Sequence, residues 1–487
     1  MTFSSFSNRR RAVIGRRAVV IPLLSAALIT LGVPEGAAAQ TRSGALLPAQ
    51  ATDPFRGGVP DLTPTADVVT VSIADAIRRA LTHNLGVRLA GDAVDQARSD
   101  HATALADLLP NVTGSISETR RKTNLEAFGF PLGPTFPRVV GPYNVFDARV
   151  FASQSLLDLV AINDMRAESH RLSAARHSFR GARETVVLVT ANLYLQTLAA
   201  SARADSARAQ VDTAQALYAQ AQDLRQSGIV AGLDVVRAET RLMGDRQRAI
   251  AAANDYEKMK LQLARVMGLA IGQEYRLTTD VPEVPVPQMT IEEALARAYR
   301  DRPDYLAAQE RVRAAESARR SAGAEYLPTV RLTADYGTIG LEVGNALPTF
   351  SVAGAVDVPI FRGGRTQARV GEADAELRSR RAEAEDMRAA IYIDVRSAFL
   401  DLRAGEAELA AATRGRELAD LQLTQSRDRF TAGVADNVEV IQAQEAVARA
   451  AEQFIAAQYQ FSVAKALLAR SLGAGEDAVA KYLGGLP

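Results

Sequence analysis

The sequence predicts a mainly α-helical protein with a small β part, built from two copies of one unit. Two observations support this prediction. Matching segments recur in the same order in the two halves of the 487 residues. Each half also holds a proline-free, alanine-rich stretch far longer than an ordinary globular helix. Within each copy the patterns predict a helix, two strands and a helical hairpin, in that order.

The duplication fixes the predicted domain limits. Residues 72–76 (SIADA) match residues 290–294 (TIEEA), and the Leu-Pro step at 109–110 recurs at 327–328. The spacing between matching segments shortens after the first strand, which places a longer loop in the first copy. We predict copies at residues 70–268 and 288–473, separated by a proline-containing connector at 269–287 and followed by a C-terminal tail at 474–487.

The N-terminus has the pattern of a secretion signal. Five arginines precede a short apolar stretch at residues 18–31, and an A-x-A cleavage pattern ends at Ala39. Residues 1–39 are therefore predicted to be a signal peptide. General secretion is the expected route, and the paired arginines leave twin-arginine export as an alternative. Residues 40–69, rich in Pro, Gly and Thr, are predicted to form an extended N-terminal arm.

The composition argues against an enzyme and against a nucleic-acid partner. The chain has no cysteine, and its net charge of +1 shows no basic excess. Of its four histidines, only His170 and His177 are spaced to share a helix face, and two histidines are poor evidence for a metal site. We expect no catalytic residue, no metal and no cofactor. No segment after the signal reaches about 18 consecutive apolar residues, so no transmembrane helix is predicted.

Each copy is predicted to open with a capped helix. Ser72 and Asp75 have capping-box spacing, as do Thr290 and Glu293. Apolar residues then recur at helical spacing. Because proline ends a helix near the preceding residue, a single helix is expected to continue to the Leu-Pro step of each copy.

Two strands are expected after each Leu-Pro step. They lie near residues 111–121 and 143–154 in the first copy, and near 329–338 and 347–358 in the second. Apolar and polar residues alternate along them. This period of two predicts a sheet with one wet face.

Each copy should end as a helical hairpin. The outgoing arm at residues 157–226 would be about 105 Å long at 1.5 Å per residue. The predicted turns lie at 226–229 and 431–434. Arms of this length must pack as coiled coils, with alanine seams and a few larger knobs at Val187, Tyr194, Leu198, Val211 and Leu224.

Four strands are too few to close a transmembrane barrel, whose usual minimum is about eight. Lipid cannot satisfy open strand edges. The chain must therefore oligomerise, or its strands must stay outside the membrane. Three chains would supply twelve strands.

The whole pattern resembles the TolC-type outer membrane efflux family. The marks are the two Leu-Pro steps, the turn at 358–364 (VPIFRGG), the segment 429–433 (RFTAG) followed by 438–440 (VEV), and the closing run at 458–473. The resemblance implies a homotrimer with a shared 12-stranded β-barrel in outer-membrane lipid and an α-barrel tunnel in the periplasm. It also implies docking onto a periplasmic adaptor (membrane fusion) protein that is tied to an inner-membrane transporter.

The resemblance also implies the functional residues. A periplasmic aperture would be lined just past the hairpin turns, at Glu439 and Gln442 in the second copy and at Asp234 and Arg237 in the first. Because Gln442 is not acidic, a single ring of Glu439 is implied, and solvated coiled-coil positions are the alternative. The hairpin tips would dock the adaptor through Gly228, Ile229, Val230, Ala231, Gly433, Val434, Ala435 and Asp436.

The implied function is the exit duct of a tripartite efflux pump or of a type I secretion system. It would be located in the bacterial outer membrane and extend into the periplasm. A periplasmic coiled-coil adaptor or scaffold is the alternative. Two hairpins and few strands favour the channel, because an adaptor usually carries one hairpin within β-rich domains.

Overall fold

The computed structural model describes residues 53–60, 63–129, 137–228, 230–278, 289–432, 434 and 437–473. The predicted signal peptide, the start of the arm, most of the connector and the C-terminal tail lie outside these residues.

The duplication is evident in the order of elements. The first copy contains α1 (Ile73–His83), α2 (Leu85–Ala106), β2 (Asn111–Asn124), β3 (Val139–Leu157), α3 (Leu159–Gln226) and α4 (Gly232–Met267). The second contains α5 (Ile291–Asp301), α6 (Pro303–Ala324), β5 (Thr329–Gly340), β6 (Leu347–Asp357), α7 (Arg365–Thr431) and α8 (Asn437–Ser471).

Both predicted capping boxes are present. In α1 the Ser72 hydroxyl accepts from the Asp75 backbone N–H at 3.1 Å, and the Asp75 carboxylate accepts from the Ser72 N–H. Thr290 and Glu293 make the same pair at the start of α5. These reciprocal contacts satisfy backbone donors that the first helical turn leaves unpaired.

The prediction of one continuous opening helix in each copy is wrong. Asn84 separates α1 from α2, and Arg302 separates α5 from α6; both residues have extended backbone angles. The Asn84 side chain accepts from the Gly86 N–H and donates to the Phe55 carbonyl, both at 2.8 Å, so it caps α2 and fixes the arm. In the second copy Pro303 occupies the first position of α6, where its missing N–H costs nothing.

The four long strands form one antiparallel sheet in the order β2-β3-β5-β6. All four lie close to their predicted ranges, and β3 is longer than predicted at both ends. Residues paired across the sheet share a face. Tyr336 pairs with Phe350 and Val330 with Val356, whereas Asp335 pairs with Ser351. One face is therefore apolar and the other polar, as the period of two predicts.

A second, small sheet was not predicted. The three-residue strands β1 (Val69–Val71) and β4 (Tyr275–Leu277) pair in parallel and join the arm to the connector. The Tyr194 hydroxyl of α3 donates to the carbonyl of Thr278, 2.8 Å away, and also lies 3.1 Å from the carbonyl of Val71. Strands this short have no periodicity that could reveal them. The tyrosine contacts tie the small sheet to α3.

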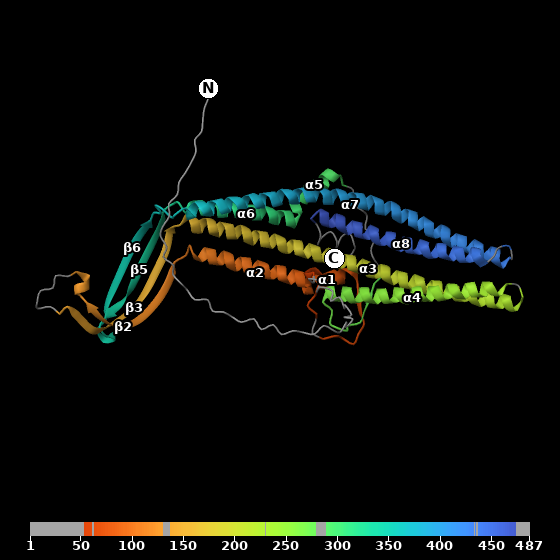
Figure 1. The fold of residues 1–487 in the computed structure, drawn as a ribbon, viewed down its shortest axis with the longest axis horizontal. Helices are drawn as coiled ribbons and strands as arrows, with labels where there is room; N and C mark the ends of the chain where they lie inside the picture. Colours follow the sequence, from red (N-terminus) through yellow and green to blue (C-terminus); the bar gives the residue numbers. More distant parts are fainter. Residues whose placement is uncertain are drawn as a thin grey trace, which may run out of the picture. The chain divides into compact units, whose positions relative to one another are not determined.

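The hairpins α3–α4 and α7–α8 pack as the predicted coiled coils (Figure 1). Buried small residues recur every seven positions along the seams. On α3 they are Ala200, Ala207, Ala214 and Ala221, and on α8 they are Ala443, Ala450, Ala457 and Ala464. Because α3 also packs on α8, the four long helices lie side by side in the order α7-α8-α3-α4.

The helix α3 contains an 18-residue window whose composition would suit a membrane span, and 56% of that window is buried inside the molecule. Val186, Val187 and Tyr194 of α3 are fully buried against α1, α4 and the small sheet. Packing within the protein accounts for these apolar residues.

Candidate functional site: the hairpin ends

The hairpin turns expose small and apolar side chains. In the first turn Gly228 has a left-handed backbone (φ 74°) with open space around it. Val230 is half-buried and Ala231 exposed. Leu233, at the start of α4, is 58% exposed, and Val434 of the second turn is 67% exposed. Four of the predicted tip residues lie outside the described residues: Ile229, Gly433, Ala435 and Asp436.

The predicted aperture residues of the first copy pair with each other. Asp234 lies in the first turn of α4, and its Oδ1 is 3.4 Å from Nη1 of Arg237, one turn further along. This neighbouring arginine offsets part of the carboxylate charge. The pair lies at the helix N-terminus, where an acid also complements the helix dipole.

In the second copy, Glu439 contacts the opposite arm of its hairpin. Its Oε1 lies 3.2 Å from Nε of Arg429 on α7 and 3.4 Å from the Ser426 hydroxyl. Gln442 is exposed one turn further along α8. The four predicted aperture residues therefore occupy the first two turns of α4 and α8.

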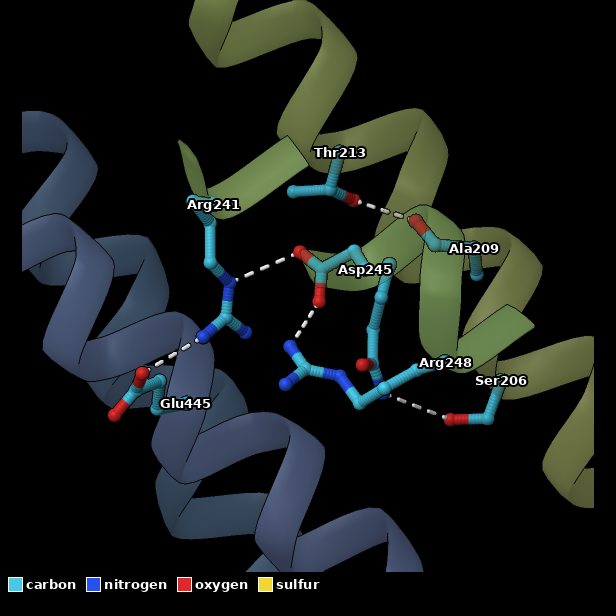
Figure 2. Close-up of polar contacts among 8 residues, drawn as sticks. Ser206, Ala209, Thr213, Arg241, Asp245, Arg248 and Glu445 are labelled. Carbon is cyan, nitrogen blue, oxygen red and sulfur yellow. Dashed lines mark hydrogen bonds and ion pairs between the residues drawn. The ribbon is translucent and has the colours of Figure 1, made fainter. Parts of the chain in front are cut away.

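A larger polar network, which was not predicted from the sequence, joins the two hairpins (Figure 2). Arg241 on α4 lies 2.9 Å from the Asp245 carboxylate and 2.8 Å from the Glu445 carboxylate on α8. Arg248 also pairs with Asp245. The Asp245 side chain is only 2% exposed. A buried carboxylate requires such partners, because an unpaired charge is costly in a desolvated site.

Two further contacts extend this network along α8. Arg203 of α3 lies 3.0 Å from Glu452, and Gln196 of α3 donates to the Tyr459 hydroxyl at 2.9 Å. Together with Glu445, these α8 residues are spaced by seven positions, so they share one face of the helix. We call the contacts of Glu445, Glu452 and Tyr459 the inter-hairpin ladder. The heptad spacing was visible in the sequence, but nothing local indicated which partner helix would face it.

A hollow of about 730 Å³ lies beside the ladder, between α3, α4 and α8. Its lining mixes four arginines and three carboxylates, and it holds no nucleophile with a matching base. The charged lining residues are Arg203, Arg241, Arg248, Arg449, Asp255, Glu445 and Glu452.

Among the described residues, no group of three or more His, Cys, Asp or Glu side chains could hold a metal ion. His170 instead pairs with Glu310 on α6, with 2.7 Å between Nδ1 and Oε2. Burial lowers the pKa of His177, which favours the neutral imidazole in the α3 interface.

Taken together, the structure combines a sheet with one apolar and one polar face, two long helical hairpins and exposed apolar residues at the hairpin ends. The sequence profile of the family "Outer membrane efflux protein" matches residues 76–269 and 291–474. The chain belongs to this family, whose members are channel proteins of the outer membrane.

Individual relatives match over most of their length. The pyoverdine export outer membrane protein OpmQ of Pseudomonas putida is 24% identical over 415 residues, covering 82% of this chain and 85% of OpmQ. The outer membrane protein OprJ of Pseudomonas aeruginosa is 23% identical over 432 residues, covering 84% and 85%. The crystal structure of the Campylobacter jejuni CmeC outer membrane channel superimposes with a TM-score of 0.74 at 18% identity, covering 92% of this chain and 94% of CmeC.

Proposed function

We propose that the chain is the exit duct of a tripartite efflux pump or of a type I secretion system and carries no catalytic activity of its own. The supporting observation is the continuity of the two long helices. α3 and α7 start at the sheet and end at the hairpin turns, 68 and 67 residues later. With the sheet in the outer membrane, helices of this length reach about 100 Å into the periplasm.

Three chains would complete the duct. Within one chain, β2 and β6 are the two edges of the four-stranded sheet. Pairing β6 of one chain with β2 of the next chain leaves no strand edge exposed to lipid and gives a barrel of twelve strands. Chemical crosslinking of the protein in detergent should give a trimer band. A monomer that inserts stably into bilayers would contradict this proposal.

The hairpin ends would dock a periplasmic adaptor protein tied to an inner-membrane transporter. Leu233 and Val434 are exposed apolar residues at the far end of the helices, and among the described residues they belong to no buried core. Such a surface suits the apolar tips of a partner's helices. The relative OpmQ is a pyoverdine export protein, and export of such a compound is compatible with a duct of this kind.

A tip substitution tests the docking. Val434→Glu should abolish export in cells while trimers still form, because a charge in a desolvated contact is costly. Val434→Ala is the matched control and should keep most of the export. Unchanged export by Val434→Glu would refute docking at this tip.

The aperture would be formed by Glu439, with Asp234 adding charge from the other hairpin. Three copies of each carboxylate brought close together should attract cations and bind multivalent ones. In planar bilayers, wild-type channels should prefer cations and be blocked by a trivalent cation from the periplasmic side. Glu439→Gln should weaken both effects, and Glu439→Gln combined with Asp234→Asn should weaken them further. If neither variant changes them, both acids are solvated helix positions.

A further inference from the structure

The two copies differ where the strand meets the long helix. In the first copy β3 ends at Leu157 and α3 begins two residues later. Asp158 makes this tight junction, since its Oδ1 accepts from the N–H groups of Val160 and Ala161, both at 3.0 Å. In the second copy seven residues, 358–364, separate β6 from α7. We call residues 358–364 the junction loop.

The junction loop has the backbone of a projecting turn. Gly363 and Gly364 have left-handed angles (φ 59° and 80°), and no side chain caps α7. A Cβ atom at either position would have no atom within 4 Å. The glycines therefore supply backbone conformation and not space. They form a tight turn directly after the apolar segment, in which the Arg365 N–H donates to the Arg362 carbonyl, 3.2 Å away.

Two adjacent apolar residues of the junction loop are among the most exposed in the described chain. Ile360 is 94% exposed, Phe361 is 86% exposed and Val358 is 61% exposed. Two adjacent large apolar side chains that are almost fully exposed indicate a contact with an apolar partner outside this chain, such as lipid or another protein.

The sheet register places the loop at a membrane boundary. Thr329, the first residue of β5, pairs with Asp357, the last of β6, so both helix-side ends of these strands are level. The neighbouring connection from α6 to β5 also exposes Tyr326 and Leu327. The apolar sheet face, with Val352 and Val356, leads directly to this level. The loop therefore continues the surface that faces lipid when the sheet spans the membrane.

Positive charge lies immediately beyond the apolar residues. Arg362 lies 3.3 Å from the Glu325 carboxylate and is 39% exposed. Arg365, the first residue of α7, is exposed, and no ion pair is found for it among the described residues. Guanidinium groups bind phosphate oxygens well, and an apolar tip followed by arginine is suited to the boundary between acyl chains and headgroups.

We propose that the junction loop is a lipid anchor, in which Ile360 and Phe361 enter the periplasmic leaflet of the outer membrane and Arg365 lies among the lipid phosphates. This inference rests on the proposed position of the sheet in the membrane. Within each chain only the second copy of the unit contains the junction loop, so a trimer contains three anchors. A neighbouring chain of the trimer could cover the loop instead of lipid, and the experiment distinguishes contact with lipid from contact with a neighbouring chain.

The chain contains no tryptophan, so one substitution creates a unique fluorescent reporter. Three single variants are reconstituted into phosphatidylcholine vesicles: Phe361→Trp in the loop, Phe350→Trp on the apolar sheet face and Leu400→Trp on an exposed face of α7. Each is measured in plain vesicles and in vesicles whose acyl chains carry bromine either near the headgroup or deep in the bilayer. Bromine quenches tryptophan only on near contact.

The anchor predicts at least a twofold loss of Phe361→Trp emission with shallow bromines, less loss with deep bromines, and no loss for Leu400→Trp. Quenching of Phe350→Trp without quenching of Phe361→Trp would overturn the anchor and leave the sheet in the membrane. Blue-shifted but unquenched Phe361→Trp emission would assign the loop to a subunit contact. Absence of quenching at both phenylalanine positions would refute the membrane position of the sheet as well.

Discussion

The two copies share a core pattern and differ in the polar groups placed on it. The buried residues of α3 and α7 match position for position around the middle of each helix. The pairs are Val186 and Ile391, Thr190 and Val395, Leu193 and Ala398, Tyr194 and Phe399, and Thr197 and Leu402. In three of these five pairs the first copy has a hydroxyl where the second has an apolar side chain.

The same asymmetry recurs nearer the hairpin ends. The buried Asp245 of α4 corresponds to the buried Ala450 of α8. The apolar spacing is therefore what both copies need in order to pack as coiled coils. In the first copy, Tyr194 contacts the small β1–β4 sheet, and Arg241, paired with Asp245, contacts the second hairpin.

The largest effect is expected from removing the buried carboxylate. Asp245→Ala, which gives the first copy the residue of the second, leaves Arg241 with less compensation in a desolvated site and should cost about 3–5 kcal/mol of unfolding free energy. Thermal or denaturant unfolding in detergent measures this loss. Replacing both Arg241 and Asp245 by leucine should recover much of it. A loss below about 1 kcal/mol for Asp245→Ala would show that the network is solvated.

The tyrosine difference should have a smaller effect. Tyr194→Phe removes the hydroxyl that contacts the Val71 and Thr278 carbonyls and should cost about 1–2 kcal/mol. The reciprocal Phe399→Tyr buries a hydroxyl among apolar side chains and should also destabilise the protein. Unfolding of each variant is compared with wild type. If Phe399→Tyr has no effect, the second core is not as dry as its composition indicates.

The smallest effect concerns a carboxylate at the end of α6, and it depends on pH. The hydrogen bond from Arg369 holds the pKa of Glu325 below its ordinary value of 4.5. A lowered folded-state pKa adds stability above the unfolded-state pKa, and this stability is lost as the pH falls through the folded-state value. Glu325→Gln should therefore lower the melting temperature near pH 7 and have little effect well below pH 4.

The matching position in the first copy provides the control for this prediction. Asp107 occupies it and is exposed to solvent. Asp107→Asn should leave the melting temperature nearly unchanged at both pH values. A pH-independent difference between wild type and Glu325→Gln would mean that the Arg369 contact does not depend on the carboxylate charge.

Most of the fold could be predicted from the sequence because its signals are local. Capping boxes, period-two alternation and long proline-free stretches fixed the strands and the long helices to within a few residues. The breaks at Asn84 and Arg302 were not predicted, although Pro303, at the first position of α6, is a local sign of the second break. In the first copy, the reason for the break is a contact between Asn84 and Phe55, 29 residues away.

The functional sites were less predictable, because their contacts cross between helices that are far apart in the sequence. Glu439 was singled out, but its partner Arg429 lies on the other arm of the hairpin. Arg241 and Glu445 are 204 residues apart. A heptad pattern indicates which face of a helix packs, and it does not identify the helix that packs against it.

The central proposal is that the chain forms an exit duct, and we expect the inter-hairpin ladder, which joins the two hairpins of each chain, to hold the hairpin end of that duct closed. Single-channel recording in planar bilayers tests it with the double variant Glu445→Gln/Glu452→Gln. This variant removes two charges of the inter-hairpin ladder and leaves Arg241 paired with Asp245. The control, Glu417→Gln, removes an ion pair with Arg414 inside α7. We expect a several-fold higher conductance or open probability for the double variant and no change for the control. Wild-type conductance in the double variant would contradict the claim.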